Sequence, residues 1–441
     1  DVGDLLTVTT KPILVSCRRK QDGGKWEGSE DERMQLLRQA IVAGPAYIEL
    51  ELDVAGGIPR FGDTKRVVSF NSYKPLANVE DVFKQAKQVK SDVVKFTWPT
   101  PTLEAAWPLL AAVTKKRDLP VVGQGIGPAG LAFSLLGRKY GSPWIYAALE
   151  QGMEAFEGEP TVGELDEVYA WRDIGPKTRF VGLAGFDQHE TTTARVLNAG
   201  FQSLGLSTRC LPLALGGRDK LAKMLDVLKI NALVLGPHAP AGLLDFADQA
   251  EDAAKETGCA DLLLHQPDGW HAYNLLWRSA LAALEAALGK SAADSRPLEK
   301  RAVLCLGGGA TAALAWGVQH RQGLLSVAAP DDDAARRSAK QWGARFVPFT
   351  SLYDTLAEIV VTADPVLAVG HHKGELNPSY LRPSMTVLDL SHAPGDSPLL
   401  AEARGRGCRV IEPRAVLAEL VAAQFKSVTG KDLPAAVKES L

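Results

Sequence analysis

The sequence predicts an α/β protein with two architectures built from parallel strands. In the first 170 residues, short β-branched runs alternate with amphipathic helix-like stretches, a pattern typical of βα units. At residues 302–312, a strand-like run leads into a glycine-rich turn and a helix, which is the layout of a nucleotide-binding βαβ unit. We therefore expect an N-terminal (β/α) TIM-barrel-like domain, followed by a two-lobed α/β module with a Rossmann-type nucleotide lobe.

The barrel prediction depends on six strand-like runs separated by helix-like segments. This order is expected for parallel strands joined by crossover helices. In such barrels the chemistry lies at the carboxyl ends of the strands, where we expect Arg18, Asn71 and Lys95. The expected strands span 13–17, 47–52, 67–70, 93–96, 121–123 and 144–147, and the expected helices span 31–43, 79–89 and 103–116.

A second pattern begins near residue 178 and ends in the glycine-rich turn. Glycines there let backbone N–H groups approach a pyrophosphate, so Gly307, Gly308, Gly309 and Ala310 are candidate cofactor-binding residues. The two outer positions of a GxGxxG register are not glycine, so a plain Rossmann-like turn without a nucleotide stays equally open. The other expected elements are strands at 180–184, 232–235 and 261–264, helices at 191–204 and 273–288, and a linker at 289–297.

Lys95 is a lone amine near the end of an apolar, β-type run. Desolvation lowers the pKa of an amine and leaves more of it neutral, so a buried lysine can attack a carbonyl carbon and form a Schiff base. The alternative is a lysine at a strand end whose ammonium group reaches solvent. Both interpretations are compatible with the segment alone.

Composition limits the classes of partner. The 441 residues carry a net charge of −3 with both signs mixed along the chain, which gives no basic footprint for nucleic acid or an anionic membrane. The five cysteines form no CxxC pair, so neither a disulfide framework nor a metal site is predicted, and a reducing cytoplasm is expected. No apolar run approaches the roughly 20 residues that span a bilayer.

The chain resembles two known families in succession. Residues 12–18, followed by Asp22-Gly23-Gly24, resemble the opening of the type I 3-dehydroquinate dehydratase signature, and the later strand segments follow in the family's order. From residue 182 onward the chain is similar to shikimate dehydrogenase. Together they resemble the bifunctional dehydratase–dehydrogenase of the shikimate pathway of aromatic amino acid biosynthesis. This resemblance implies lyase and oxidoreductase activities on a small anionic cyclic carboxylate.

For the dehydratase half, the resemblance implies a Schiff base on Lys95, a substrate carboxylate held by Arg18, and no cofactor. The family's general-base histidine falls at Asn71, and Asp22 replaces the glutamate that orients it. An asparagine amide cannot exchange a proton near neutral pH, whereas general acid–base catalysis supplies about 10²–10⁴-fold in rate. The proton carrier is left open between Asp22, Tyr73 and water.

Two further positions of the dehydratase family differ. Its substrate-clamping arginine falls at Ser134, and Arg138 lies one helical turn away. Its lid resembles residues 155–159, where Glu157 and Glu159 now stand. Two added carboxylates disfavour an anionic substrate.

In the dehydrogenase half, the catalytic lysine and aspartate of the family fall at Ala239 and Leu276. Neither replacement can transfer a proton, so we expect this half to be inactive. The serines that hold the substrate carboxylate correspond to Thr191 and Thr193, which keep a hydroxyl group. The family's asparagine corresponds to Asp261.

The segment that selects the NADP phosphate in the family corresponds to residues 329–331 (Ala-Pro-Asp), which offer no cation to a 2′-phosphate. NADP is therefore the expected cofactor of the fold but a poor match to this loop. His371 and His372 are expected in a solvated loop. His392 falls at the family's substrate-side tyrosine, and His189 is given no role.

The family barrel has eight strands, and the two missing strands would precede residue 13. Either the chain is trimmed at its start, where it begins with Asp rather than Met, or something else covers two open sheet edges. We expect a dehydratase-like barrel at 1–170, a substrate lobe at 178–290, a nucleotide lobe at 298–412, and a C-terminal segment at 413–441 whose helix packs on the substrate lobe.

Two functions follow from these positions. The first is a shikimate-pathway enzyme, or a relative with a shifted substrate, that works through Lys95. The second is a non-catalytic paralogue that keeps both folds as a binding or regulatory module, because Asn71, Ala239 and Leu276 remove the proton-transferring groups of both halves. The oligomeric state is not predicted by the sequence.

Overall fold

The computed structural model describes residues 2–71, 78–187, 191–240, 242–289, 296–308, 311–363, 367–391 and 397–441. Two compact units divide the chain: residues 1–182 with 205–230, and residues 183–204 with 231–441. Among the described residues, no helix has both the length and the apolar character needed to cross a membrane.

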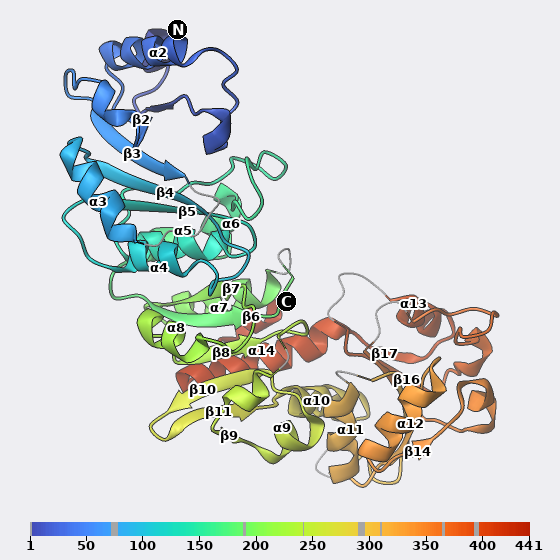
Figure 1. The fold of residues 1–441 in the computed structure, drawn as a ribbon. Coiled ribbons are helices and arrows are strands. Elements are labelled where there is room, and N and C mark those ends of the chain that lie inside the picture. Colours follow the sequence, from blue (N-terminus) through green and yellow to red (C-terminus); the bar gives the residue numbers. More distant parts are fainter. Residues whose placement is uncertain are drawn as a thin grey trace. The chain divides into compact units, whose positions relative to one another are not determined.

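The first unit contains a five-stranded parallel sheet whose strands follow chain order, β1-β2-β3-β4-β5 (Figure 1). α-Helices connect β1 to β2, β3 to β4 and β4 to β5, and a short 3-10 helix (Ala55–Gly57) lies between β2 and β3; this order confirms the (β/α) barrel-like architecture. Within the described residues, β1 and β5 form the two edges of this sheet. The strands are β1 (Leu14–Ser16), β2 (Tyr47–Glu51), β3 (Lys65–Asn71), β4 (Val93–Pro99) and β5 (Val121–Ile126), and the helices are α1 (Val2–Thr7), α2 (Glu30–Ala43), α3 (Val79–Gln88), α4 (Trp107–Thr114), α5 (Gly130–Lys139) and α6 (Val162–Glu167).

The sixth strand expected at residues 144–147 is wrong. That segment is irregular, and only the next residue, Ala148, makes an isolated bridge to Thr161. The aromatic residues that imitate strand alternation instead pack against the sheet: the ring of Trp144 lies 5.0 Å from that of Tyr47. Tertiary packing of large side chains therefore produced the strand-like pattern.

A second sheet has the order β7-β6-β8-β10-β11-β9, in which β10 runs antiparallel to both β8 and β11. The predicted helix at 273–288 begins three residues later than expected, because residues 269–273 form β11. The C-terminal helix α14 (Pro413–Thr429) packs against α7 (Thr192–Ser203) and α10 (Leu276–Ala287). The remaining elements are β6 (Arg179–Ala184), β7 (Thr208–Leu213), β8 (Ala232–Leu235), β9 (Gln249–Ala250), β10 (Leu262–Gln266), β11 (Gly269–Tyr273), α8 (Leu221–Leu228), α9 (Asp252–Thr257) and α15 (Ala435–Glu439).

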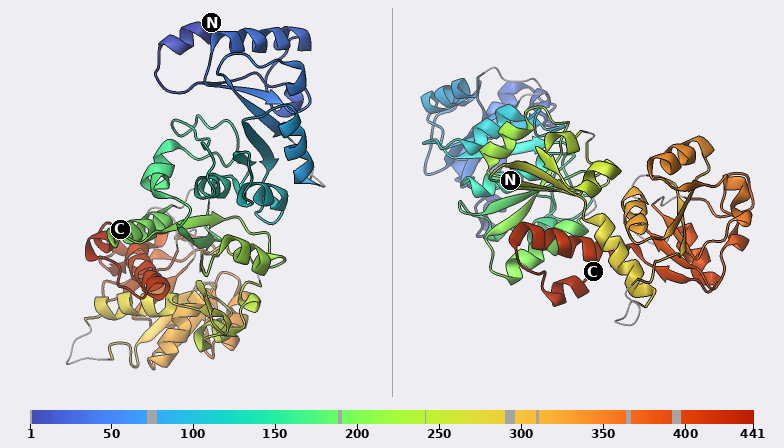
Figure 2. Two further views of the ribbon diagram at one scale, coloured as in Figure 1. Left: turned by 90° about the vertical axis from the view of Figure 1, so that its left-hand side faces the viewer. Right: turned by 90° about the horizontal axis from the view of Figure 1, so that it is seen from below.

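The third sheet is fully parallel and has the order β14-β13-β12-β15-β16-β17. This is the doubly wound order 3-2-1-4-5-6 of dinucleotide-binding folds. Separate apolar clusters line its two faces, and the views of Figure 2 show helices on both sides. The predicted Rossmann-type lobe is thus confirmed. Its elements are β12 (Ala302–Leu306), β13 (Leu324–Ala328), β14 (Arg345–Phe346), β15 (Ile359–Thr362), β16 (Thr386–Asp389), β17 (Arg409–Ile411), α11 (Thr311–His320), α12 (Asp332–Gln341) and α13 (Pro398–Gly405).

Candidate functional site

One face of the first sheet carries an unusual number of polar side chains. Successive side chains of a strand point to opposite faces, so residues in register share a face with their partners. Lys95 on β4 is in register with Ser69 on β3, which is in register with Glu51 on β2. The next row along the same face holds Asn71, Thr97 and Gln124.

Lys95 lies at the centre of this face and is fully buried. Its Nζ is 3.2 Å from Oε2 and 3.3 Å from Oε1 of Glu49, a buried carboxylate on β2. Nε of Arg18, just after β1, is 3.1 Å from Oε1 of Glu49. The same Nζ lies over the ring of Tyr146, 4.4 Å from its centroid. Two cations therefore share one buried carboxylate.

Buried apolar residues lie on the same sheet as this charged group. Val67, Val93 and Val122 form a buried cluster against which Trp144 and Tyr146 pack. Burial lowers the pKa of the Lys95 amine from its ordinary 10.5 to about 8; Glu49 opposes this shift and Arg18 adds to it. A larger fraction of the amine is thus neutral near pH 7 than in an ordinary lysine. The interpretation of Lys95 as a solvent-reaching lysine at a strand end is wrong.

Glu49 and Tyr146 were not predicted as site residues. The signal for Glu49 was a carboxylate inside a buried strand, which natural proteins keep only when it is paired. Burial, aided by the charge of Glu49, raises the pKa of the Tyr146 phenol to about 12, so this hydroxyl stays protonated at neutral pH.

Asn71 stands one row beyond Lys95, at the carboxyl end of β3. Both Nδ2 and Oδ1 of its amide are buried and have no hydrogen-bond partner among the described residues. An unpaired buried amide costs free energy, so the position suits a bound molecule that both donates and accepts hydrogen bonds. Tyr73, the second proton carrier considered, falls outside the described residues.

Asp22 is held by a different ion-pair group. Nε of Arg19 lies 2.6 Å from Oδ2 of Asp22, and Arg19 also donates two hydrogen bonds to Asp53, at 2.8 and 3.0 Å. Glu51 is likewise held by Arg33, which is completely buried and lies 3.0 Å from both carboxylate oxygens. The structure thus brings Arg18 and Lys95 together through Glu49, whereas Asp22 contacts Arg19.

The expected clamp and lid residues lie elsewhere in this unit. Arg138 is exposed, its guanidinium lies 5.7 Å from the Trp171 ring centroid, and it donates to the carbonyl of Arg172 at 3.4 Å. Glu159 accepts a 2.6 Å hydrogen bond from the Ala155 amide, and its negative charge favours protonated Lys95. No contact of Ser134 with the Lys95 group is observed in the described residues.

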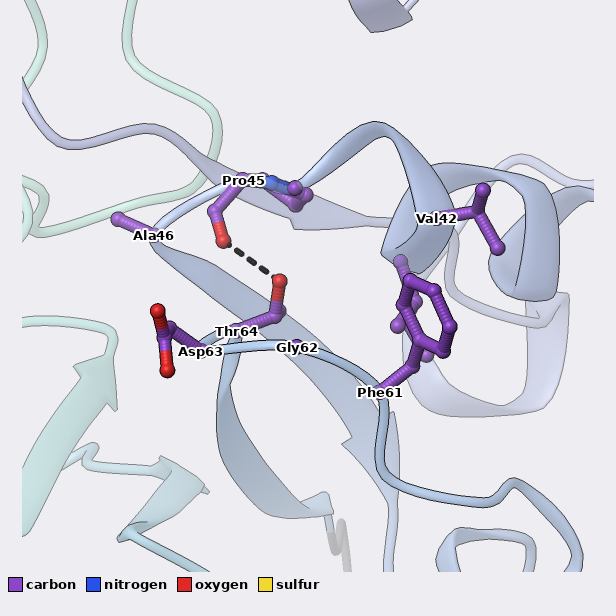
Figure 3. A pocket seen from close by; sticks show the side chains of 9 residues that line it. Val42, Pro45, Ala46, Phe61, Gly62, Asp63 and Thr64 are labelled. Carbon is purple, nitrogen blue, oxygen red and sulfur yellow. Dashed lines mark hydrogen bonds between the residues drawn. The ribbon is translucent and has the colours of Figure 1, made fainter.

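A surface pocket of about 260 Å³ lies at the opposite end of the strands (Figure 3). It is lined by the residues that precede β2 and β3, among them Phe61 and Val42, and Thr64 Oγ1 donates to the carbonyl of Pro45 at 2.9 Å. This end of a (β/α) barrel serves stability rather than chemistry. The pocket is therefore separate from the Lys95 group.

In the dehydrogenase-like part, Ala239 and Leu276 offer no titratable group, as the sequence predicts. Thr193 is buried in α7, and Thr191 precedes that helix without capping it through its side chain. Asp261 is buried, and its Oδ2 accepts the N–H groups of Leu275 and Leu276, both at 2.7 Å. Burial raises the pKa of this carboxyl to about 7. His189 lies outside the described residues.

The glycine turn follows β12 directly. Gly307 has φ +95°, a conformation that residues with a side chain rarely adopt. Of the four candidate cofactor-binding residues, Gly307 and Gly308 belong to the described residues, whereas Gly309 and Ala310 lie outside them. At the start of α12, Asp331 accepts hydrogen bonds from the N–H groups of two later residues. A carboxylate at this place suits an unphosphorylated ribose better than a 2′-phosphate.

The histidines of the nucleotide lobe give no catalytic group. His371 and His372 are exposed, in agreement with the expected solvated loop, and the backbone N–H of His372 donates to Glu375 at 2.9 Å. His392 lies outside the described residues. Among the described residues, no cluster of His, Cys, Asp and Glu has the geometry of a metal site.

Comparison with known proteins supports the division of the chain into a dehydratase-like part and a dehydrogenase-like part. Residues 2–176 match the family described as type I 3-dehydroquinase. Over 98% of this chain and 76% of the other, the sequence is 26% identical to a chloroplastic bifunctional 3-dehydroquinate dehydratase/shikimate dehydrogenase of Arabidopsis thaliana. It is 26% identical to a shikimate dehydrogenase (NADP(+)) of Acidiphilium cryptum over 53% of this chain and 84% of that protein.

A solved shikimate dehydrogenase in complex with NADP+ superposes with a TM-score of 0.52 at 22% identity, covering 60% of this chain and 94% of that one. Fold and sequence together define a type I 3-dehydroquinase domain followed by a module with the shikimate dehydrogenase fold. Over nearly its whole length the chain is similar to a bifunctional 3-dehydroquinate dehydratase/shikimate dehydrogenase, in the order of domains that the sequence motifs predict.

Proposed function

We propose that the first unit binds a small carbonyl compound as a Schiff base on Lys95, which is the first step of 3-dehydroquinate dehydration. One observation carries the proposal: Lys95 is a buried amine, with its pKa lowered to about 8, and it lies three residues into β4 (Val93–Pro99) rather than at the carboxyl end that the sequence predicts. A partly neutral amine in dry surroundings is the nucleophile that attack on a ketone requires.

The charges at this site favour a small anionic substrate only weakly. Arg18 and Lys95 supply two positive charges, and Glu49 neutralises one of them. Glu159 adds a further negative charge that acts on Lys95. The proposed ligand is therefore a cyclic ketone with a single carboxylate held near Arg18.

For the second half, we propose that shikimate reduction has been lost. Ala239 and Leu276 cannot carry the proton that reduction of a carbonyl must add. The fold shared with an NADP-bound shikimate dehydrogenase supports a nucleotide-binding lobe. The carboxylate of Asp331 argues against the phosphate of NADP in that lobe.

The alternative is a non-catalytic paralogue that binds a ligand or regulates a partner. The unpaired amide of Asn71 favours it, because an amide can bind a ligand but cannot act as the base that dehydration needs. Under this alternative Lys95 holds a carbonyl compound, or only pairs with Glu49, and no turnover follows.

We infer a reducing compartment such as the cytoplasm. All five cysteines are free thiols in the structure, which is usual for proteins kept in reducing surroundings. The bifunctional Arabidopsis relative is chloroplastic, so microscopy of the full-length protein fused to a fluorescent reporter must decide between the two compartments.

The deciding experiment is borohydride trapping with 3-dehydroquinate, followed by peptide mass mapping. A stable adduct on Lys95, absent from a folded Lys95→Ala variant, is the expected result. A folded wild-type protein that gives no adduct would contradict the Schiff-base proposal and leave the non-catalytic alternative. Formation of the dehydrated product is measured in the same samples, because an adduct without product separates ketone binding from turnover.

A further inference from the structure

We propose that Glu49 carries the proton that Lys95 releases before it attacks a carbonyl group, and returns that proton to the departing water. The inference rests on the proposed Schiff base at Lys95. It assigns a catalytic role to a residue whose carboxylate touches the reacting nitrogen at 3.2 and 3.3 Å.

The geometry of the Lys95–Glu49 pair suits proton transfer between the two side chains. Lys95 and Glu49 lie on strands separated by β3, and both side chains point to the polar face of the sheet. Nζ is nearly equidistant from the two carboxylate oxygens, so a proton can pass to either without movement of the backbone. Both side chains are buried, with Lys95 0% and Glu49 3% exposed, so bulk water has little access to the pair as a competing acceptor.

Among the described residues, no other carboxylate or imidazole is within hydrogen-bond distance of the Lys95 amine. Residues 1–188 contain no histidine. The carboxylates of Asp22 and Glu51 are held by Arg19 and Arg33. The other groups that face or act on Lys95 are Arg18, which is cationic, the protonated phenol of Tyr146, and the more distant Glu159.

The proposed step conserves atoms and charge. The ammonium of Lys95 passes one proton to the carboxylate of Glu49, and the neutral amine adds to the carbonyl carbon to form a C–N bond. After a proton moves from nitrogen to oxygen, the carbinolamine C–O bond breaks as the Glu49 carboxylic acid protonates the departing hydroxyl. The products are a protonated imine, one water molecule and an ionised Glu49.

Arg18 completes this arrangement. Its Nε lies 3.1 Å from Oε1 of Glu49, so the carboxylate keeps a cationic neighbour when Lys95 is neutral. Glu49 can then be ionised at both ends of the step, which a buried carboxylate without a cation could not sustain.

The alternative role for Glu49 is to neutralise a buried lysine, and the two roles predict opposite effects of Glu49→Gln. If Glu49 only neutralises Lys95, Glu49→Gln makes the protonated amine less stable, so more of the amine is neutral and its attack becomes faster or stays unchanged. If Glu49 carries the proton, the same Glu49→Gln change makes imine formation slower, by about 100-fold or more. The sign of the change therefore distinguishes the roles.

The test measures the rate of Lys95 modification by acetaldehyde and cyanoborohydride at pH 7, with peptide mapping. Acetaldehyde is the probe because it needs no substrate-specific contact. We expect Glu49→Gln to slow modification of Lys95 by about 100-fold, and Glu49→Asp to recover part of that loss. Glu159→Gln removes a charge that acts on Lys95 from a distance and is expected not to slow it. Circular dichroism verifies that each variant is folded.

Two results overturn the proposal: a folded Glu49→Gln protein modified as fast as wild type or faster, or a wild-type Lys95 that stays unmodified while exposed lysines react. Trapping with 3-dehydroquinate is run in parallel. If acetaldehyde modifies Lys95 but 3-dehydroquinate does not, the proposed substrate is wrong, and the role of Glu49 is still decided by the Glu49→Gln rate.

Discussion

Lys95 in the first half of the chain and Asp261 in the second are buried residues whose pKa is displaced toward neutrality, but they have different neighbours. Lys95 has a pKa near 8 and lies beside a carboxylate, a second cation and an aromatic ring. Asp261 has a pKa near 7 and is held by two backbone N–H groups at the start of α10. Burial shifts both groups, yet only Lys95 has a partner that can exchange its proton.

This contrast explains why a displaced pKa alone does not define an active site. A reacting group needs a donor or acceptor beside it, which Lys95 has in Glu49; one row away, the buried amide of Asn71 has no hydrogen-bond partner among the described residues. Asp261 instead accepts two backbone N–H groups, and residues 239 and 276 offer no titratable side chain. Under the proposed function, the first unit therefore keeps a nucleophile, whereas the second keeps its fold without a proton-transferring side chain at residues 239 and 276.

The largest expected effect comes from giving the first unit a base. Asn71→His places an imidazole one row from Lys95, and we expect formation of the dehydrated product to rise by about 10²–10⁴-fold over wild type. The absorbance of the new conjugated carbonyl measures it. Asn71→Ala is the matched control, and equal rates in the two variants would show that a missing base is not what limits this half.

Trapping at Lys95 is expected to depend strongly on pH. Only the neutral amine attacks. Where solvent takes the proton, a pKa of about 8 makes the rate of adduct formation rise about tenfold per pH unit from pH 5 and level off above pH 8, and proton transfer to Glu49 makes this rise less steep below pH 8. Quenched-flow trapping across this range measures the profile. A rate that still climbs tenfold per unit at pH 10 would mean that Lys95 titrates as an ordinary lysine.

The ion pair of Arg33 provides a structural counterpart to the Lys95 pair. Arg33→Met leaves Glu51 buried without its cation, so we expect the free energy of unfolding to fall by about 3–5 kcal/mol. Urea denaturation measures this loss. The exposed pair of Lys87 and Asp118 is the control, because Lys87→Met is expected to cost about 1 kcal/mol or less. Similar losses for both variants would refute the structural role of Arg33.

Asp261 is expected to make stability depend on pH in the direction opposite to most carboxylates. Its pKa is about 7 in the folded protein and 3.8 ordinarily, so the folded state binds more protons between these values. The stabilisation is complete below pH 3.8 and is lost as pH rises through 7, by about 1.4 kcal/mol per pH unit.

Urea unfolding at pH 5 and pH 7 tests this dependence on Asp261. Asp261→Asn keeps the shape of the side chain and is expected to remove this part of the slope. Asp226→Asn, at an exposed position on α8, is the control and is expected to leave it unchanged. An equal slope in wild type and Asp261→Asn would place the pH dependence elsewhere.

The local sequence predicted the helices and strands well where the spacing of apolar residues clearly had the period of a strand or of a helix. The runs at 93–96 and 232–235 became β4 and β8, and the helix at 191–204 became α7. The run at 144–147 failed because its apolar alternation serves packing under the sheet rather than hydrogen bonding at its edge. Periodicity reports which side chains are buried and does not report what covers them.

The sequence by itself determined the α/β class and the order of the two folds, because these depend on local periodicity and residue chemistry. It singled out Lys95, but only the tertiary structure decided that this amine is buried. Tertiary structure decided that Glu49 faces Lys95, that Arg18 shares this carboxylate, and that Asp22 pairs with Arg19. These contacts depend on the register between parallel strands far apart in sequence. A shift of one residue would turn each side chain to the opposite face of the sheet.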